Sequence, residues 1–265
     1  MRALLRKTET EGVLVGLTIH HVCSSWIAKL YADAGADFVF LENEHMLFNG
    51  ANLAEFILAC RLCGLPVVAK IPYVNRGAVT KLLDAGVTGI QLPMTETASQ
   101  IAEVVRYTKF PPWGVRAASP GTGNTLYRDV DCASWLKESD QETAVIAHIE
   151  TVEGLNRVDE ILEVPGVDVM FVGMFDLSVS LGCPGQYRDP RLLDAIDRLV
   201  KASVRHAKTA GIWVPDYELA KPWIERGVRF FETQGEVGFI AEGAARLVSC
   251  FAGRRLRENP GMRHI

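Results

Sequence analysis

A helix-like stretch, a glycine and a short apolar run follow one another repeatedly along this chain, and this repeat restricts the possible folds more than any other feature. Glycine after a helix can adopt the left-handed conformation that turns the chain back. The Val-, Ile- and Phe-rich runs that follow suit strands buried on both faces. The repeat occurs at 33–41, 62–70, 84–92, 164–172, 209–214 and 226–233. We therefore expect helices alternating with buried parallel strands.

Two further apolar runs, at 12–19 and 144–150, bring the expected strands to eight. We place them at 13–18, 38–42, 67–70, 89–92, 145–149, 168–172, 212–214 and 229–232. Eight parallel strands close into a barrel with the helices outside, so we predict an α/β protein with a (β/α)8 TIM barrel. An open doubly wound sheet has the same alternation, but no G-x-G-x-x-G motif follows the first strand.

The stretches between these strands are amphipathic, most clearly at 190–208. Asp189 can cap this helix, and Pro190 suits its first position. A second helix is expected at 97–107. The rest of the interval from 93 to 144 is rich in Pro, Gly and Ser, which is typical of a long loop that is functional or held by a neighbouring subunit.

No linker divides the 265 residues, so we expect one domain, 1–265, in which 238–265 form a C-terminal helical tail. A net charge of −4 argues against binding nucleic acid or an anionic membrane. The chain has neither an apolar run of about 20 residues nor a signal-peptide segment at its start, so we expect a cytoplasmic protein. Cys60 and Cys63 form a lone C-x-x-C, and we interpret all six cysteines as reduced packing residues.

Polar residues follow the predicted strands at the end where barrel enzymes carry their chemistry. They are His20, His21, Glu42, Glu44, His45, Lys70, Gln91, His148, Glu150, Asp176, Asp216 and Gln234. Because they come from separate strands, we expect them to converge on one mouth, as the residues of a functional site do.

Glu150 and Asp176 each close a neighbouring strand with few other charges nearby. Two carboxylates completed by water and substrate oxygens suit Mg²⁺ or Mn²⁺. The alternative is that each carboxylate only caps the helix that follows it. His45 is a candidate acid/base because histidine titrates near neutral pH, although a loop histidine bonded to backbone is equally compatible with the pattern.

Lys70 ends the third strand, where it could bind an anion or an enolate oxygen, or form a Schiff base with a ketone. A lysine that only extends its charge to solvent is the alternative. Arg116 and Arg128 in the long loop could bind a substrate carboxylate, and simple solvent exposure is the alternative for both.

Several motifs together resemble the HpcH/HpaI aldolase family of metal-dependent pyruvate aldolases, over about 12–247. The most specific are DFVFLENEH (37–45), KIPYVN (70–75), LLDAGVTGIQLPM (82–94), HIETVEGL (148–155), VPGVDVMFVGMFDLSVSLGCPGQ (164–186) and GVRFFETQGEVGFI (227–240). Each motif alone is weak, but their order and spacing make coincidence improbable. The resemblance implies that Glu150 and Asp176 hold one divalent cation, Mg²⁺ or Mn²⁺. It also implies that His45 is the acid/base and that Asp84 raises its basicity.

The same resemblance implies that the backbone at Phe175 and Asp176 holds the pyruvate carboxylate and that His148 touches the substrate. Arg116 joins these residues as a substrate-binding candidate on the loop argument above. Members of this family form trimers or hexamers of barrels that exchange their C-terminal helix. The resemblance therefore implies a homotrimer or homohexamer.

The chain departs from the family pattern around the expected site. The family usually has arginine at the position of Lys70, glutamine at His148 and alanine at Phe175. It usually has glycine at Met46 and proline at Met174. Lysine keeps the charge of arginine but loses its planar two-pronged donor. These changes indicate an altered choice of substrate or an altered reaction.

The expected activity is that of a class II aldolase, a carbon–carbon lyase that joins pyruvate to an aldehyde, or cleaves the 4-hydroxy-2-oxo acid, through a pyruvate enolate. One alternative keeps the metal enolate but forms the bond decarboxylatively, as in citrate-forming or macrophomate-type chemistry. Two others are a Schiff-base aldolase that uses Lys70 and a barrel without turnover.

Overall fold

The computed structural model describes residues 1–10 and 12–252. Eight parallel strands form a closed barrel in chain order, and β8 pairs with β1. They are β1 Leu14–Ile19, β2 Phe38–Leu41, β3 Val67–Lys70, β4 Gly89–Leu92, β5 Ala144–Ile149, β6 Val169–Val172, β7 Thr209–Trp213 and β8 Phe230–Gly235. The predicted (β/α)8 barrel is therefore confirmed.

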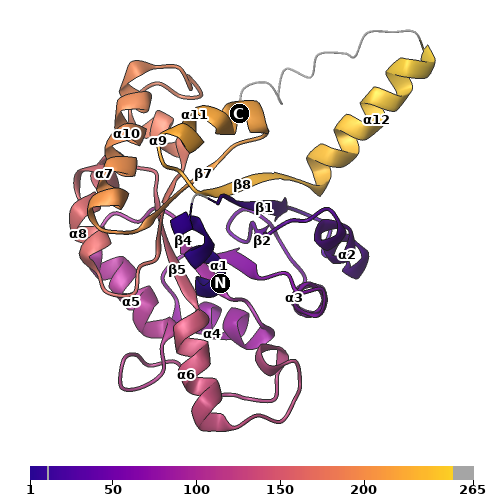
Figure 1. Cartoon of the computed structure of the whole chain (residues 1–265), viewed down its shortest axis with the longest axis vertical. Helices are drawn as coiled ribbons and strands as arrows, with labels where there is room; N and C mark the ends of the chain where they lie inside the picture. The colour runs from indigo at the N-terminus through magenta and orange to yellow at the C-terminus, as the bar shows by residue number, and fades with distance from the viewer. Residues whose placement is uncertain (11, 253–265) are drawn as a thin grey trace.

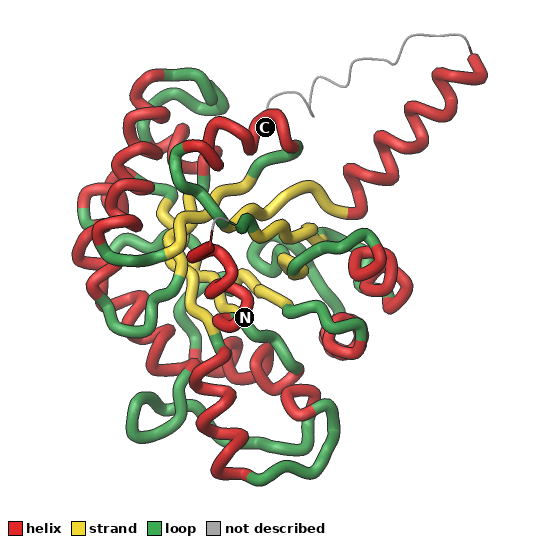
Figure 2. Tube along the Cα trace, in the orientation of Figure 1, coloured by secondary structure: helices red, strands yellow, loops and turns green. Residues whose placement is uncertain are grey.

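Helices surround this barrel (Figures 1 and 2). They are α2 Ser25–Asp33, α3 Gly50–Leu62, α4 Arg76–Ala85, α5 Ala98–Thr108, α6 Cys132–Glu142, α7 Val152–Asn156, α8 Val158–Glu163, α9 Met174–Ser180, α10 Pro190–Arg205 and α11 Tyr217–Glu225. The predicted start of α10 is confirmed, because Asp189 accepts a hydrogen bond from the backbone N–H of Arg191 and Pro190 lies in the first turn. Gly86 ends α4 with φ of 113°, the left-handed conformation that the repeat requires.

Large aromatic side chains fill the barrel interior. Its buried cluster contains Met1, Leu5, Leu14, Phe38, Phe40, Val68, Ala144, Ile146, Val169, Phe171 and Phe230, with Trp213 packed against it. The rings of Phe38 and Phe230 stack with centroids 4.5 Å apart. Gly16 makes room for them, because a Cβ at Gly16 would lie 2.2 Å from the ring of Phe38. This aromatic layer lies directly beneath the C-terminal mouth of the barrel.

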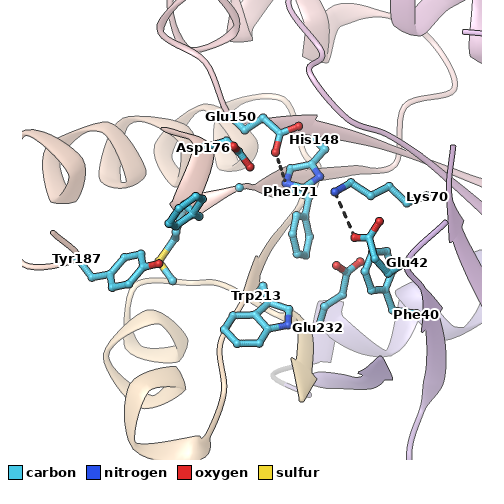
Figure 3. A pocket seen from close by; sticks show the side chains of 13 residues that line it. Phe40, Glu42, Lys70, His148, Glu150, Phe171, Asp176, Tyr187, Trp213 and Glu232 are labelled. Atoms are coloured by element: carbon cyan, nitrogen blue, oxygen red, sulfur yellow. Dashed lines mark hydrogen bonds and ion pairs between the residues drawn. The ribbon is translucent and has the colours of Figure 1, made fainter. Parts of the chain in front are cut away.

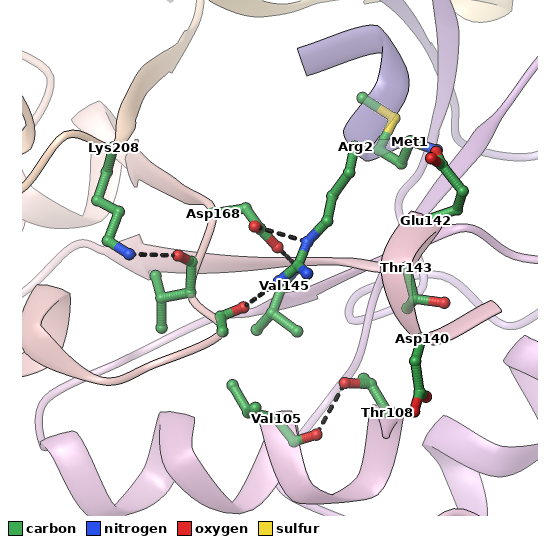
Figure 4. A network of polar contacts seen from close by, with 12 residues as sticks. Met1, Arg2, Val105, Thr108, Asp140, Glu142, Thr143, Val145, Asp168 and Lys208 are labelled. Carbon is green, nitrogen blue, oxygen red and sulfur yellow. Dashed lines mark hydrogen bonds and ion pairs between the residues drawn. The ribbon is translucent and has the colours of Figure 1, made fainter. Parts of the chain in front are cut away.

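The opposite, N-terminal end of the barrel is closed by α1 Arg2–Leu5, whose flanking Met1 packs into the interior cluster. Arg2 Nε lies 2.7 Å from the carboxylate of Asp168, which also accepts a hydrogen bond from the backbone of Val145 (Figure 4). Lys208 donates to the carbonyl of Val167 at 2.8 Å. These polar contacts hold α1 across the N-terminal end, and the residues expected to form a site lie at the opposite end.

The interval predicted as a long loop contains two elements that the sequence analysis missed, α6 and a short 3-10 helix, η2 Gly123–Thr125. Asp131 caps α6 by accepting from the backbone of Ser134. The six cysteines are free, as predicted, but Cys132 and Cys250 are exposed, so their interpretation as packing residues was wrong. Both lie on polar or projecting helix faces rather than in the core.

The helix α12 Glu236–Ala252 continues from β8 and projects away from the barrel (Figure 1). Glu236 anchors its start by accepting hydrogen bonds from the backbone of His20, His21 and Val22. The predicted tail begins within this helix, and its part from 253 lies outside the described residues. No helix among the described residues is long and apolar enough to cross a membrane.

Candidate active site

A pocket of about 590 Å³, open to solvent, lies at the C-terminal mouth of the barrel (Figure 3). Side chains from β2, β3, β5, β6, β7 and β8 and from the loops after them line it. They are Phe40, Glu42, Lys70, His148, Glu150, Phe171, Gly173, Met174, Phe175, Asp176, Tyr187, Trp213 and Glu232. The structure thus brings together Lys70, His148, Glu150, Phe175 and Asp176, which the sequence analysis proposed as site residues, and with them Glu42 and Met174, which it also named.

Glu150 and Asp176 both face this pocket. Neither acts as a helix cap: Thr151 caps α7 by accepting from the backbone of Gly154, and the N-cap of α9 is Gly173. Burial, together with the nearby charge of Asp176, raises the pKa of Glu150 to about 7, against the opposing effect of the Lys70 ammonium. Glu150 is buried and Asp176 is exposed, and two carboxylates that repel each other beside an open pocket favour a cation between them.

The surroundings of Glu150 leave space for such a cation. Its Oε1 accepts a hydrogen bond from the backbone N–H of Met94 at 2.6 Å, and Met94 adopts a positive φ of 48°. A Cβ at Gly173 would lie 2.5 Å from both Glu150 Oε2 and His148 Nε2, so the absence of a side chain keeps this corner open. Carboxylate oxygens beside an open cavity fit a hard divalent ion held by Glu150 and Asp176.

Gly173→Ala is therefore expected to weaken binding of Mn²⁺ at least about tenfold while the barrel stays folded, because the new methyl group displaces the Glu150 carboxylate. Calorimetric titration with Mn²⁺ measures the effect, and circular dichroism checks the fold. Gly50→Ala is the matched control, since a Cβ at Gly50 meets nothing within 4 Å. Equal Mn²⁺ affinity in Gly173→Ala and wild type would contradict the assignment.

His148 is buried and bridges two partners. Gln91 Nε2 lies 3.2 Å from His148 Nδ1, and His148 Nε2 lies 3.3 Å from Glu150 Oε2. Burial and the Lys70 charge hold the pKa of His148 well below its usual value, so the imidazole is neutral. Because the Gln91 amide donates to Nδ1, the single proton resides on Nε2. His148 Nε2 thus carries a proton close to Glu150, and it forms no hydrogen bond with a described residue.

Lys70 is held as an ammonium ion. Its Nζ lies 2.7 Å from Glu44 and 3.3 Å from Glu42. Burial alone would lower its pKa, but the carboxylates around it outweigh this effect and raise the pKa to about 12. Lysine in this state carries charge and is a poor nucleophile.

His45 lies beside the same cluster but does not line the pocket. Its Nε2 is 3.5 Å from Glu44 Oε2, and its side chain is 62% exposed. The donor atoms of Glu42, Glu44 and His45 lie within 4.8 Å of one another, close enough for a metal. The Lys70 ammonium already pairs with both of these carboxylates, however, so we regard this cluster as an ion-pair network.

The structure does not bring Asp84 or Arg116 into the pocket. Asp84, in α4, lies 3.6 Å from the guanidinium of Arg116 and accepts from Asn124. Arg116 is 3% exposed, donates to Ser139 at 2.9 Å and stacks over the ring of Phe110. A buried guanidinium needs such partners, and they fix the loop rather than a substrate. Arg128 is exposed.

Glu232 is a charged pocket residue that the sequence analysis did not single out. It lies within β8, inside an apolar run that we interpreted only as a strand, and the charged residue within that run was the available signal. Burial raises the pKa of Glu232 well above its usual value, despite Lys70 and a hydrogen bond with Gln91. Its Oε1 has no partner among the described residues. Phe40, Tyr187 and Trp213 were missed as well, because their types suggested only packing.

The raised pKa of Glu232 predicts a pH dependence of stability. Above the ordinary value of 4.5 the unfolded state loses the proton while the folded state keeps it. Folding therefore weakens by about 1.4 kcal/mol per pH unit from this group as pH rises toward its folded pKa. Glu232→Gln removes this slope, so the stability of the variant relative to wild type should rise as the pH increases above about 5. Urea unfolding at each pH measures the difference, with the exposed Glu153→Gln as control; parallel curves would contradict the prediction.

Comparison with known proteins agrees with this architecture. The model of the HpcH/HpaI aldolase/citrate lyase family matches residues 23–235. The 4-hydroxy-2-oxo-heptane-1,7-dioate aldolase of Escherichia coli is 28% identical over 257 residues, covering 95% of this chain and 94% of that protein. The hydroxypyruvate/pyruvate aldolase of Roseobacter denitrificans is 27% identical over 236 residues, covering 89% and 91%.

A solved structure extends the agreement to three dimensions. The crystal structure of the HpcH/HpaI aldolase from Desulfitobacterium hafniense superposes with a TM-score of 0.88 at 28% identity, covering 94% of this chain and 96% of that one. Because the family model spans most of the barrel, including the segments that carry Lys70, Glu150 and Asp176, the chain belongs to the HpcH/HpaI aldolase/citrate lyase family.

Proposed function

We propose that this enzyme is a divalent-metal-dependent aldolase that forms or cleaves 4-hydroxy-2-oxo acids through a pyruvate enolate. One observation carries the proposal: Glu150 and Asp176 face a common open pocket that also contains a charged Lys70 and a neutral His148. Membership of an aldolase and lyase family supports the same reaction class.

When bound by Glu150 and Asp176, Mg²⁺ or Mn²⁺ would supply positive charge that stabilises the enolate. The Lys70 ammonium adds a second positive charge to the lining of the same pocket. His148 Nε2–H can donate to an oxygen of the substrate, and Gln91 holds the imidazole in that tautomer. We assign the backbone N–H groups of Phe175 and Asp176 to the pyruvate carboxylate.

We propose His45 as the acid/base for the hydroxyl proton of the aldol. In the single chain its carboxylate neighbour is Glu44, which can accept a hydrogen bond from the imidazole. Asp84 has other partners within the chain, so its proposed effect on His45 needs a contact that the described residues of one chain do not make. We leave Arg116 out of the proposed site for the same reason.

The decarboxylative alternative is supported by the residues at which the chain departs from the family pattern. His148, Met174 and Phe175 all line the pocket, where they can change the electrophile that meets the enolate. The Schiff-base alternative is disfavoured by the ammonium state of Lys70. A barrel without turnover is disfavoured by the raised pKa of Glu150, since carboxylates with perturbed pKa values in a cleft are typical of functional sites.

Pyruvate in deuterated water tests the proposal without any aldehyde. With Mn²⁺ present, we expect the pyruvate methyl protons to exchange for deuterium, as followed by NMR, and EDTA to stop the exchange. Oxaloacetate in the same assay distinguishes the aldolase from the decarboxylative enzyme. Release of carbon dioxide from oxaloacetate only when an electrophile is added would favour the decarboxylative reaction. Exchange that persists in EDTA and is trapped by borohydride would overturn the proposal in favour of an imine.

We also propose that the enzyme is a single-domain homotrimer or homohexamer in which the C-terminal helix packs on a neighbouring subunit. In α12 the side chains of Ile240, Leu247, Val248 and Phe251 are all more than half exposed in the single chain. A projecting helix with such a surface needs a partner to cover it. Light scattering after size-exclusion chromatography measures the assembly, and a monomer at micromolar concentration would contradict the proposal.

A further inference from the structure

We infer that the second substrate is an uncharged, aromatic aldehyde. This inference rests on the proposed aldolase function and narrows it to one class of electrophile. Two independent properties of the pocket support this inference. Aromatic side chains line the pocket, and its described residues include no free cation that could pair with a second carboxylate.

Trp213 and Phe40 line the pocket on the side away from Glu150 and Asp176, and the ring of Phe171 lies between, 4.9 Å from that of His148 (Figure 3). Phe171 and Trp213 come from the neighbouring strands β6 and β7, with Phe40 across the barrel on β2. Phe171 and Phe40 are buried, and Trp213 is half-buried, so their rings present an apolar wall to whatever enters. Ring edges and faces of this kind pack well against another aromatic ring.

Phe175, next to Asp176 in α9, and Tyr187 add two further rings to the lining of the pocket, near Asp176. Phe175 is 55% exposed, which is unusual for a phenylalanine beside a polar site. A ring that enters between Phe175 and Trp213 would cover both from water.

The charges of the pocket exclude an acidic aldehyde. Among the described residues that line it, Lys70 is the sole lysine or arginine, and Glu42 and Glu44 already pair with it. Glu42 and Glu232 lie on the same side as Trp213, and Trp213 is paired with Glu232 in the register of β7 and β8. A carboxylate placed there would be desolvated without a cationic partner among the described residues.

The E. coli relative is named for a dioate, which carries a carboxylate at each end. Cleavage between C3 and C4 of such a compound leaves one carboxylate on pyruvate and the other on the aldehyde. In the present chain Arg116, the arginine singled out for a substrate carboxylate, is buried against Asp84 instead. The aldehyde half of a dioate therefore has no cation to meet it among the described residues of this pocket.

The proposed reaction balances without any further reactant. Pyruvate loses one methyl proton, and the resulting enolate carbon forms a bond with the carbonyl carbon of the aldehyde. The carbonyl π electrons move to the aldehyde oxygen, which takes up one proton to become the 4-hydroxyl. The product is a 4-aryl-4-hydroxy-2-oxobutanoate, and cleavage runs the same steps in reverse.

Matched aldehydes test the inference with the wild-type enzyme, pyruvate and Mn²⁺. Methyl 4-formylbenzoate and 4-formylbenzoate differ only in charge, and we expect kcat/KM to be at least about 100-fold higher for the ester. Butanal and succinic semialdehyde repeat the comparison without a ring, and benzaldehyde should exceed butanal by about tenfold or more. Equal or higher kcat/KM for the charged member of either pair would overturn the inference.

Variants of Trp213 test whether the aromatic side chains of the pocket cause the preference for uncharged, aromatic aldehydes. Trp213→Leu should lower the ratio of kcat/KM for benzaldehyde to kcat/KM for butanal about tenfold. Trp213→Arg should raise the ratio of kcat/KM for succinic semialdehyde to kcat/KM for butanal. Each ratio compares two aldehydes with the same variant, so a general loss of activity does not change it. Trp113→Leu, at a 78% exposed tryptophan outside the pocket lining, is the matched control and should leave both ratios unchanged.

Deuterium exchange into pyruvate separates this inference from the proposed function. If exchange occurs and aromatic aldehydes fail while acidic ones react, only the inference is wrong. If pyruvate does not exchange at all with Mn²⁺ present, the aldolase function fails and the inference falls with it.

Discussion

Replacing Glu150 by glutamine is expected to lower pyruvate deuterium exchange at least about 1,000-fold, the largest effect we predict for a single substitution. The amide keeps the shape of the side chain and can still meet the backbone of Met94 and the ring of His148, so the barrel should remain folded. It removes the negative charge that a hard divalent cation requires. NMR of the pyruvate methyl group measures the rate, and calorimetry with Mn²⁺ measures the lost affinity.

Two further variants show whether the effect belongs to this site. Asp176→Asn should match Glu150→Gln, because both carboxylates face the same cavity. Glu153→Gln removes an exposed carboxylate paired with Arg157 on α7 and should leave the rate within twofold of wild type. Full activity of Glu150→Gln, with loss in Glu44→Gln, would place the cation instead at the Glu42, Glu44 and His45 cluster.

The strands of this fold can be predicted closely from the sequence, because their signals are local. A glycine that ends a helix and the branched apolar residues after it lie within a few positions of each other. The predicted strands 67–70 and 89–92 match β3 and β4 at both ends. The helix at 132–142 was not predicted, since its only buried residue is Trp135 and it shows a weak apolar face.

The polar site could be predicted in part, for a reason that lies in barrel geometry. Residues at or just past the C-terminal end of a parallel strand share one end of the barrel, so Lys70, His148 and Glu150 could be placed together. Glu232 lies within its strand, and whether it points inward depends on the register of β8 against β7, which is a tertiary property. The partners of Asp84 and Arg116 depend on how a loop folds back over α4, which no short motif reports.

Lys70→Met is expected to lower kcat for pyruvate exchange about 100-fold, and Lys70→Arg to keep the rate within about tenfold of wild type. The reason is the ionic state of the side chain. Burial lowers the pKa of Lys70, but Glu42, Glu44 and Glu150 raise it to about 12, so near neutral pH the group acts as a fixed positive charge. Arginine keeps that charge and can pair with the same carboxylates, whereas methionine keeps only the volume.

The two Lys70 variants also distinguish a Schiff-base aldolase from a metal-dependent aldolase. An imine needs an uncharged amine, and the guanidinium of arginine cannot supply one, so an inactive Lys70→Arg enzyme together with borohydride trapping of pyruvate on the wild type would indicate a Schiff base. An active Lys70→Arg enzyme that EDTA inactivates would indicate a charge acting beside a metal. Lys29→Met, at an exposed lysine paired with Asp33, controls for loss of a lysine as such. The two carboxylates around Lys70 favour the second result, because each stabilises the ammonium form that imine chemistry must first deprotonate.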